Sequence, residues 1–158
     1  MKGVNFDTAY SSDLDRAIKT GEIIYDKPIP KANQLPRLRE RNFGSLDGKP
    51  EKHYTKGNEK KKAMTHDESW IYKHVPDMES DHELSGRFIA ALEAVASQNP
   101  GKTILVVAHG GAIRISLMKL QGFTSNELPP GSFQNGGYAE LAYVNNNFKV
   151  VQVAGVRI

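Results

Sequence analysis

The sequence contains no cysteine, no long apolar run and no large excess of either charge. Without cysteine, disulfide bonds and thiolate chemistry are excluded, as in many cytosolic proteins. No apolar run approaches the roughly 20 residues that a membrane span requires, and the first ten residues lack the apolar stretch of a secretory signal. The net charge of +3 is compatible with an anionic ligand but does not demand nucleic acid. We therefore expect a cytoplasmic protein that binds neither membranes nor nucleic acid.

The 158 residues fit one domain, residues 1–158, in which strands alternate with helices. We expect strands over 6–12, 102–108, 138–145 and 148–156 and helices over 13–25, 80–98 and 112–121. The strand 102–108 is apolar throughout, which is typical of a parallel strand that is buried on both faces. The last two strands should form an antiparallel hairpin joined by Asn146 and Asn147. This order of elements predicts a layered α/β domain.

Two serines are placed to begin helices. Ser12 follows the first expected strand, and Asp15 three positions later suits the positive end of a helix dipole. Ser80 and Glu83 have the spacing of a capping box. The apolar residues that recur after this box at helical spacing are Leu84, Phe88, Leu92 and Val95. The sequence therefore predicts one helix capped by Ser12 and a longer helix capped by Ser80.

Basic residues are concentrated in residues 49–62, which contain six lysines and a single aromatic residue, Tyr54. The simplest interpretation is a solvated loop or helix face. A second interpretation is a basic rim that attracts phosphorylated small molecules. A patch for RNA or DNA is disfavoured, because a nucleic-acid surface usually interleaves its basic residues with aromatic ones.

His109 stands where the apolar strand 102–108 meets the next helix, and Gly110 and Gly111 follow it. Ligands bind at the carboxyl ends of parallel strands, and glycine allows the backbone to approach them closely. The helix N-terminus adds unpaired N–H groups and partial positive charge, which suit a phosphate. The alternative is a buried, hydrogen-bonded histidine with a purely structural role.

Arg16 and Glu40 are two further candidates, each with a structural alternative. Arg16 lies in the first turn of its expected helix, where the dipole disfavours a cation unless an anion is near. Its alternative is an exposed ion pair with Asp13 or another carboxylate. Glu40 is flanked by Arg39 and Arg41, which favours surface ion pairs. A Glu40 carboxylate that faced a crevice instead would be able to pass a proton to a leaving oxygen.

Taken together, these stretches resemble the histidine phosphatase superfamily, the group that includes phosphoglycerate mutases. Its strand-S-S-x-L-x-R-A-x-x-T-A segment is similar to "FDTAYSSDLDRAIKTGEII", and its L-x-E-x-x-[FY]-G-x-x-[ED]-G segment to "LRERNFGSLDGK". Its P-G-G-E-S segment is similar to "PDMESDHELSGRFIAAL", with Asp77 and Met78 in place of the glycines. Its second histidine motif resembles "ILVVAHGGAIRISL", and its closing segment resembles "NGGYAEL". These segments follow the family's order and span nearly the whole chain.

The resemblance implies a fold, a ligand and a role for each candidate residue. The implied fold is a three-layer α/β sandwich with a mostly parallel sheet and a C-terminal antiparallel hairpin. Arg16 would bind a transferring phosphoryl group, Glu40 would be the general acid and base, and His109, helped by the Gly110 backbone, would hydrogen-bond phosphoryl oxygens. Arg41 would contact substrate. The implied ligand is a small phosphorylated metabolite or inorganic phosphate, and the family chemistry needs neither a metal nor a cofactor.

One part of the family pattern has no counterpart in this sequence. In the family, an arginine-histidine-glycine motif carries the nucleophilic histidine on a first strand, which lies in the middle of the sheet beside the strand that ends at His109. We therefore expect an N-terminally truncated domain that is inactive as it stands, because that histidine forms the phosphohistidine intermediate. The absent central strand also predicts unpaired strand edges, and hence a homo-oligomer or a domain swap.

The resemblance leaves three kinds of function open. The first is a phosphatase or mutase that is active only when complete, with a phosphatase favoured because the region between Gly48 and Pro76 is short for a mutase insertion. The second is a non-catalytic module that binds phosphorylated ligands. The third is a lysine-rich interaction protein on the inherited fold.

Overall fold

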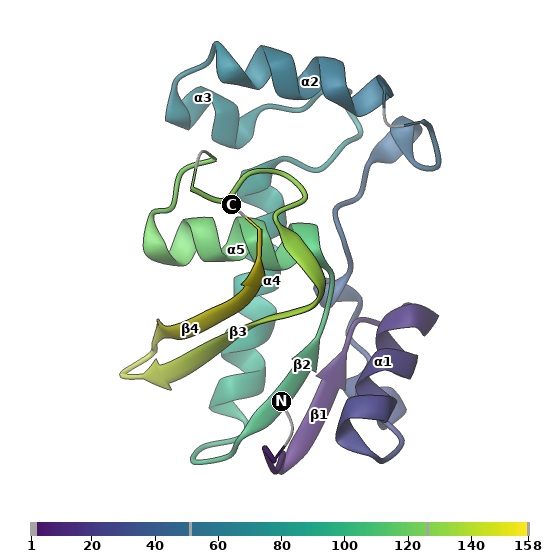
Figure 1. Ribbon diagram of the computed structural model, residues 1–158, viewed down its shortest axis with the longest axis vertical. Helices are drawn as coiled ribbons and strands as arrows, with labels where there is room; N and C mark the ends of the chain where they lie inside the picture. Colours follow the sequence, from purple (N-terminus) through teal and green to yellow (C-terminus); the bar gives the residue numbers. More distant parts are fainter. Residues whose placement is uncertain (1–2, 51, 126, 158) are drawn as a thin grey trace.

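The computed structural model describes residues 3–50, 52–125 and 127–157 and contains both strands and helices (Figure 1). The strands are β1 (Thr8–Ser11), β2 (Ile104–Val107), β3 (Phe133–Val144) and β4 (Asn147–Val156). The α-helices are α1 (Asp15–Tyr25), α2 (Lys52–Lys62), α3 (His66–Ile71), α4 (Asp81–Ser97) and α5 (Gly110–Gln121). Three short 3-10 turns, η1 (Lys31–Asn33), η2 (Pro36–Leu38) and η3 (Gly44–Leu46), lie between α1 and α2.

The central layer is the parallel pair β1–β2, in which Thr8 to Ser11 align with Ile104 to Val107. Side chains of successive strand residues point to opposite faces. Ala9 and Leu105 pack with residues of α1 in one core, whereas Tyr10 and Val106 belong to the larger core that includes α4 and α5. Helices therefore cover both faces of this pair, which confirms the predicted three-layer α/β arrangement.

The second sheet is the antiparallel hairpin β3–β4, as predicted. In Figure 1 it lies on the side of β2 opposite to β1. Within the described residues β2 is hydrogen-bonded to β1 alone, so its other edge has no strand partner there. Only Leu105 of β2 is fully buried, and the other three residues of this strand are partly exposed. The expectation of complete burial on both faces was therefore wrong.

Helix α4 forms as its local sequence predicts. Ser80 and Glu83 make both hydrogen bonds of the capping box, one from the Glu83 backbone to the Ser80 side chain and one from the Ser80 backbone to the Glu83 side chain. The four apolar residues predicted to share one face are all buried, and Leu84 is 0% exposed. This helix supplies the largest part of the core beneath β2.

Helix α1 begins later than predicted. Its N-cap is Leu14, which makes no side-chain capping bond, and Ser12 is not the cap. The Ser12 hydroxyl accepts a weak hydrogen bond from the Leu14 backbone at 3.4 Å. The backbone N–H of Ser12 donates to the Val107 carbonyl, so Ser12 extends the parallel pairing instead of starting the helix. The long-range strand contact thus overrides the local capping preference.

The hairpin turn also differs by one residue from the prediction. The two turn residues are Asn145 and Asn146, with φ of 52° and 60°, and Asn147 already belongs to β4. Two successive left-handed residues match the twist of a tight hairpin, and asparagine tolerates this conformation better than most residues.

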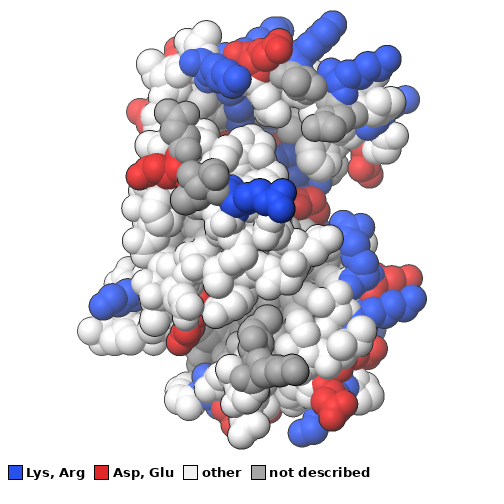
Figure 2. All heavy atoms as spheres, in the orientation of Figure 1, with Lys and Arg blue, Asp and Glu red and all other residues white. Residues whose placement is uncertain are grey.

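The lysine-rich stretch contains helix α2, most of whose lysines are exposed. Figure 2 shows basic side chains gathered at the end of the molecule where α2 lies, above a broad surface that carries few charges. Lys61 is the exception, because it is partly buried against α4. Within the described residues, no helix combines the length and apolarity needed to cross a membrane.

Candidate active site

Arg16 and His109 lie together although 93 residues separate them in sequence. Arg16 is in the first turn of α1, and His109 follows β2 and is the N-cap of α5. Because β1 and β2 are adjacent and parallel, the segments that follow them meet at the same edge of the sheet. Arg16 Nε donates a hydrogen bond of 3.3 Å to His109 Nδ1. Arg16 therefore does not form the predicted alternative pair with Asp13, which is bound by Arg39 instead.

Within the described residues, one of the two nitrogens of the His109 imidazole has a hydrogen-bond partner. A guanidinium Nε can only donate, so Nδ1 accepts and the ring proton of the neutral form lies on Nε2. His109 is 8% exposed, and its Nε2 is buried with no hydrogen-bond partner among the described residues. Burial lowers the pKa of His109 and the positive charge of Arg16 lowers it further, while Glu40 acts in the opposite direction. The lowered pKa favours the neutral imidazole, whose Nε2–H has no partner among the described residues.

Glu40 faces the N-terminus of α5. Its carboxylate accepts a hydrogen bond of 3.0 Å from the backbone N–H of Gly111 and another of 2.9 Å from the backbone N–H of Arg41. The flanking arginine side chains are engaged elsewhere, Arg39 with Asp13 and Arg41 on α4. Among the described residues, Glu40 therefore forms none of the side-chain ion pairs that its neighbours in sequence suggest.

Gly111 allows Glu40 to reach this position. A Cβ atom at residue 111 would lie 2.7 Å from one carboxylate oxygen of Glu40 and 2.8 Å from the other. Any other residue would therefore displace the carboxylate. Gly110, the first residue of α5, is exposed and adjoins Phe133 at the start of β3.

The chemistry available at this edge of the sheet is that of an oxyanion site. It combines a guanidinium, a buried imidazole N–H and the N-terminus of α5, whose first N–H groups lack helical partners. Glu40 lies within hydrogen-bond distance of the same helix end and can hold or release a proton. Within the described residues, no group of three His, Cys, Asp or Glu side chains is placed to hold a metal ion.

Comparison with known protein families gives a match over nearly the whole chain. The sequence model of the histidine phosphatase superfamily (branch 1) matches residues 1–155. The chain belongs to the histidine phosphatase superfamily. The sequence-based resemblance is therefore confirmed.

Named relatives within the superfamily include phosphatases and mutases. The chain is 31% identical over 122 residues to an uncharacterized phosphatase, PhoE, of Bacillus subtilis, covering 77% of this chain and 57% of that protein. It is 35% identical over 122 residues to a probable phosphoglycerate mutase, GpmB, of Yersinia enterocolitica, covering 76% of this chain and 53% of that protein. The chain thus spans about half the length of these curated relatives.

A solved structure of similar fold is that of a phosphoserine phosphatase variant from Entamoeba histolytica in complex with phosphoserine. The TM-score is 0.70 at 22% identity, with 94% of this chain and 74% of that chain covered. At this identity the likeness concerns the fold alone. It supports the α/β architecture predicted from the sequence.

Arg87 is a residue of this histidine phosphatase domain to which the sequence analysis gave no role. Its guanidinium forms two hydrogen bonds to the Glu79 carboxylate and donates to the backbone carbonyls of Arg37, Arg39 and Glu40 at 2.8 to 2.9 Å. Arg87 therefore ties the segment before Glu40 to α4. The available signal was the stretch "ESDHELSGR", in which Glu79 and Arg87 are eight residues apart and lie near the start of one helix.

Arg41 lies next to Glu40 in sequence, but its side chain points toward α4. It donates to the Glu79 carbonyl and pairs with the carboxylate of Asp81. Its predicted contact with substrate stays a prediction. The Asp81 carboxylate also binds Lys61 of α2, a contact that the sequence did not indicate.

Proposed function

We propose that Arg16, Glu40 and His109 form a site for the phosphoryl group of a small phosphorylated metabolite. The observation that carries the proposal is the buried Nε2–H of His109, which has no partner in the part of the chain that the structure describes, although the other ring nitrogen is fixed by Arg16. A buried donor without a partner costs free energy, and a phosphoryl oxygen would satisfy it. The Gly110 backbone at the start of α5 adds a further donor to such an oxygen.

The ligand class is supported by the names of similar proteins. The relatives include a phosphatase and a probable phosphoglycerate mutase, and a protein of the same fold was solved with phosphoserine. Inorganic phosphate and orthovanadate are the simplest probes, because both offer the same oxygens without a leaving group. The absence of cysteine from the sequence supports a cytoplasmic setting.

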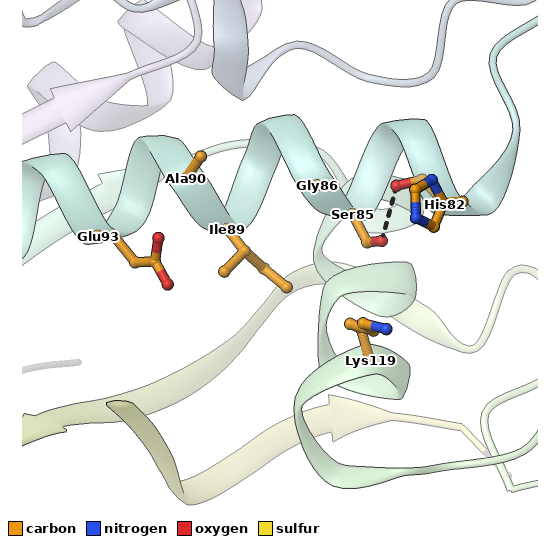
Figure 3. Close-up of a pocket in the computed structure, with 7 residues that line it drawn as sticks. All are labelled: His82, Ser85, Gly86, Ile89, Ala90, Glu93 and Lys119. Carbon is orange, nitrogen blue, oxygen red and sulfur yellow. Dashed lines mark hydrogen bonds between the residues drawn. The ribbon is translucent and has the colours of Figure 1, made fainter. Parts of the chain in front are cut away.

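We further propose that the 158 residues do not turn over a phosphomonoester unaided. Within the described residues, no second histidine is hydrogen-bonded to Arg16, Glu40 or His109. The other four histidines lie elsewhere: His53 is on α2, His66 stacks on Trp70, His74 adjoins Gly57 and Tyr72, and His82 lies at the start of α4. Figure 3 shows His82 beside Ser85, in a shallow hollow shared with Lys119 of α5. A phosphohistidine route therefore has no nucleophile at this site.

The expected result of a turnover assay follows directly. The chain should hydrolyse para-nitrophenyl phosphate no faster than its His109→Ala variant, since loss of a nucleophile removes most of the catalysis. Initial rates at saturating substrate, measured side by side, provide the comparison. Turnover by the unmodified chain that disappears in His109→Ala would contradict the proposed inactivity.

Two non-enzymatic functions compete with a catalytic one. A binding module requires the phosphate affinity of the proposed site but no turnover. A lysine-rich interaction protein requires neither phosphate affinity nor turnover. Phosphate-dependent stabilisation through Arg16 distinguishes these two. The observed contact between Arg16 and His109 favours a functional phosphate pocket over a vestigial one.

We also propose that the chain self-associates, because the edge of β2 opposite to β1 has no strand partner among the described residues. An uncovered strand edge is a template for pairing with a second copy or for a domain swap. Static light scattering at micromolar concentration should give a mass at least twice the 17.5 kDa of one chain. A monodisperse species of 17.5 kDa would overturn this proposal.

A further inference from the structure

One asparagine of this chain is placed for a reaction with its own backbone. Asn135 is followed by Gly136, and no other asparagine in the sequence precedes a glycine. Asn-Gly is the usual pair of a two-residue hairpin turn, but the turn of this hairpin is formed by Asn145 and Asn146. The Asn135–Gly136 pair lies inside β3 instead. It therefore has no part in the turn for which such a pair is normally used.

The backbone of this pair is out of register with the facing strand. Between Phe133 and Tyr138 the alignment of β3 with β4 jumps. Residues 134–137 consequently lie opposite Gly155 alone. A bulge of this kind leaves its extra residues unpaired and disrupts the ladder of hydrogen bonds. Gly136 adopts a φ of 82°, in the left-handed region that favours glycine. The pair therefore lies where the pairing of the sheet is interrupted.

Close packing at the base of the bulge leaves the pair at the surface. A Cβ atom at residue 155 would lie 2.5 Å from the Cα of Gly137, so the two strands approach one another closely at that point. A Cβ atom at residue 136, in contrast, would meet no other atom within 4 Å. Asn135 and Gly136 are both exposed. Solvent therefore reaches the pair, and there is open space around the glycine.

We propose that Asn135 is a site of spontaneous deamidation in the folded protein. The backbone nitrogen of Gly136 attacks the side-chain amide carbon of Asn135 and forms a cyclic succinimide. The carbon–nitrogen bond of the amide breaks, and the amide nitrogen leaves as ammonia with the proton of the Gly136 N–H. One molecule of water then opens the ring to aspartate or isoaspartate. This inference is independent of the proposed phosphoryl site.

Two features of the structure promote the attack. Glycine has no Cβ atom, so nothing hinders the approach of its nitrogen to the amide carbon. The interrupted ladder leaves the backbone of the bulge freer to rotate into the attacking geometry than a regularly paired strand. Asparagine is one of the thermolabile residues of proteins, so no enzyme or cofactor is required. Sequence, exposure and backbone freedom thus favour the same reaction at Asn135.

Three other asparagines of the same hairpin separate this explanation from simple exposure. Asn145, Asn146 and Asn147 are also exposed. Each of them precedes a residue that has a side chain, either another asparagine or Phe148. That side chain hinders the approach of the backbone nitrogen, so these three residues should deamidate much more slowly than Asn135. They provide internal controls within one protein sample.

The reaction changes the protein next to the candidate active site. Either product replaces a neutral amide by a carboxylate and lowers the net charge of the chain by one. Isoaspartate also adds one carbon atom to the main chain of β3. Phe133, two residues earlier, adjoins the start of α5, because a Cβ atom at Gly110 would lie 3.4 Å from the Phe133 Cβ. Deamidation therefore alters the strand that contacts the N-terminus of α5.

The test follows each asparagine of the full chain by mass spectrometry. The protein is incubated at mildly alkaline pH, and samples are digested and analysed over time. The peptide that contains Asn135 should acquire the mass of the carboxylate about tenfold faster than peptides with the turn asparagines. A protein-isoaspartate methyltransferase should then transfer methyl groups to this peptide. Asn135→Gln is the control, and methyl transfer to the same peptide should disappear because a longer side chain closes a ring slowly.

Incubation of the same protein in concentrated urea tests the role of the bulge. If the bulge leaves the pair free to react, the folded chain should deamidate at a rate within about fivefold of the unfolded chain. A folded chain that reacts more slowly than this would show that β3 protects the pair and would overturn the inference. Equal rates for Asn135 and the turn asparagines would also contradict it. Methyl transfer that persists in Asn135→Gln would assign the reaction to another residue and have the same consequence.

Discussion

Arg16→Ala should abolish the stabilisation of this chain by phosphate or orthovanadate. For the unmodified chain, ligand at a hundred times its Kd should add about 2.7 kcal/mol to the free energy of unfolding. In a domain of this size that corresponds to a rise in Tm of roughly 5–10 °C. Arg16 is exposed and fixes His109 through one hydrogen bond, so without ligand the variant should unfold near the normal Tm. Differential scanning calorimetry with and without ligand measures both quantities.

Lys19→Ala is the matched control for this experiment. Lys19 is an exposed cation on the same helix, so its removal changes the net charge equally without touching the site. The phosphate-dependent rise in Tm should persist in this variant. If both variants kept the rise, or both lost it, the effect would reflect the net charge of the protein and the proposed phosphoryl site would be wrong.

Arg87→Ala should cause the largest loss of stability among the charged residues discussed above, about 3 kcal/mol. The substitution leaves the Glu79 carboxylate without its partner and three backbone carbonyls without a donor. Glu79 is 13% exposed, so its charge becomes partly buried and uncompensated. Since Arg87 also holds the Glu40 backbone, phosphate affinity should fall as well. Urea unfolding at neutral pH gives the change in free energy.

Arg39→Ala provides the contrast for Arg87. Arg39 also forms a bidentate ion pair, with Asp13, but the Arg39 side chain is 52% exposed. An exposed pair of this kind contributes only about 0.2–1 kcal/mol. A similar loss for Arg39→Ala and Arg87→Ala would show that the Arg87 network does not hold the Glu40 segment. Arg87→Lys should restore little of the lost stability, because an ammonium lacks the planar guanidinium geometry that donates to two separate groups.

The local elements were largely predictable because neighbouring residues encode them. The capping box at Ser80 and the apolar spacing after it determine α4, and Gly122 ends α5 in a left-handed conformation. The predicted elements were wrong where a contact between residues far apart in sequence changed the local structure. Ser12 pairs with β2 through its backbone instead of capping α1, and no local pattern reveals that bond.

The candidate site was predictable as a set of residue types but not as a geometry. The sequence indicated two junctions that face an anion. At one, Arg16 follows a strand that ends in two serines, and at the other, His109 ends a strand and is followed by two glycines. Glu40 between two arginines suggested a surface ion pair, and only the structure shows that both arginines turn away from it. The roles of these residues in phosphate binding stay predictions.

By itself, the sequence determined the α/β class, the family and the two junctions at which helices begin. The reason is that the spacing of apolar residues, the helix-capping residues and the order of the motifs are properties of residues near one another in the chain. Tertiary structure alone decided which charges meet. It paired Arg39 with Asp13 and Lys61 with Asp81. It also left His109 Nε2 without a hydrogen-bond partner among the residues that the structure describes. The physical reason is that an ion pair or a buried donor depends on packing between segments tens of residues apart, and a linear pattern of charges is compatible with many such arrangements.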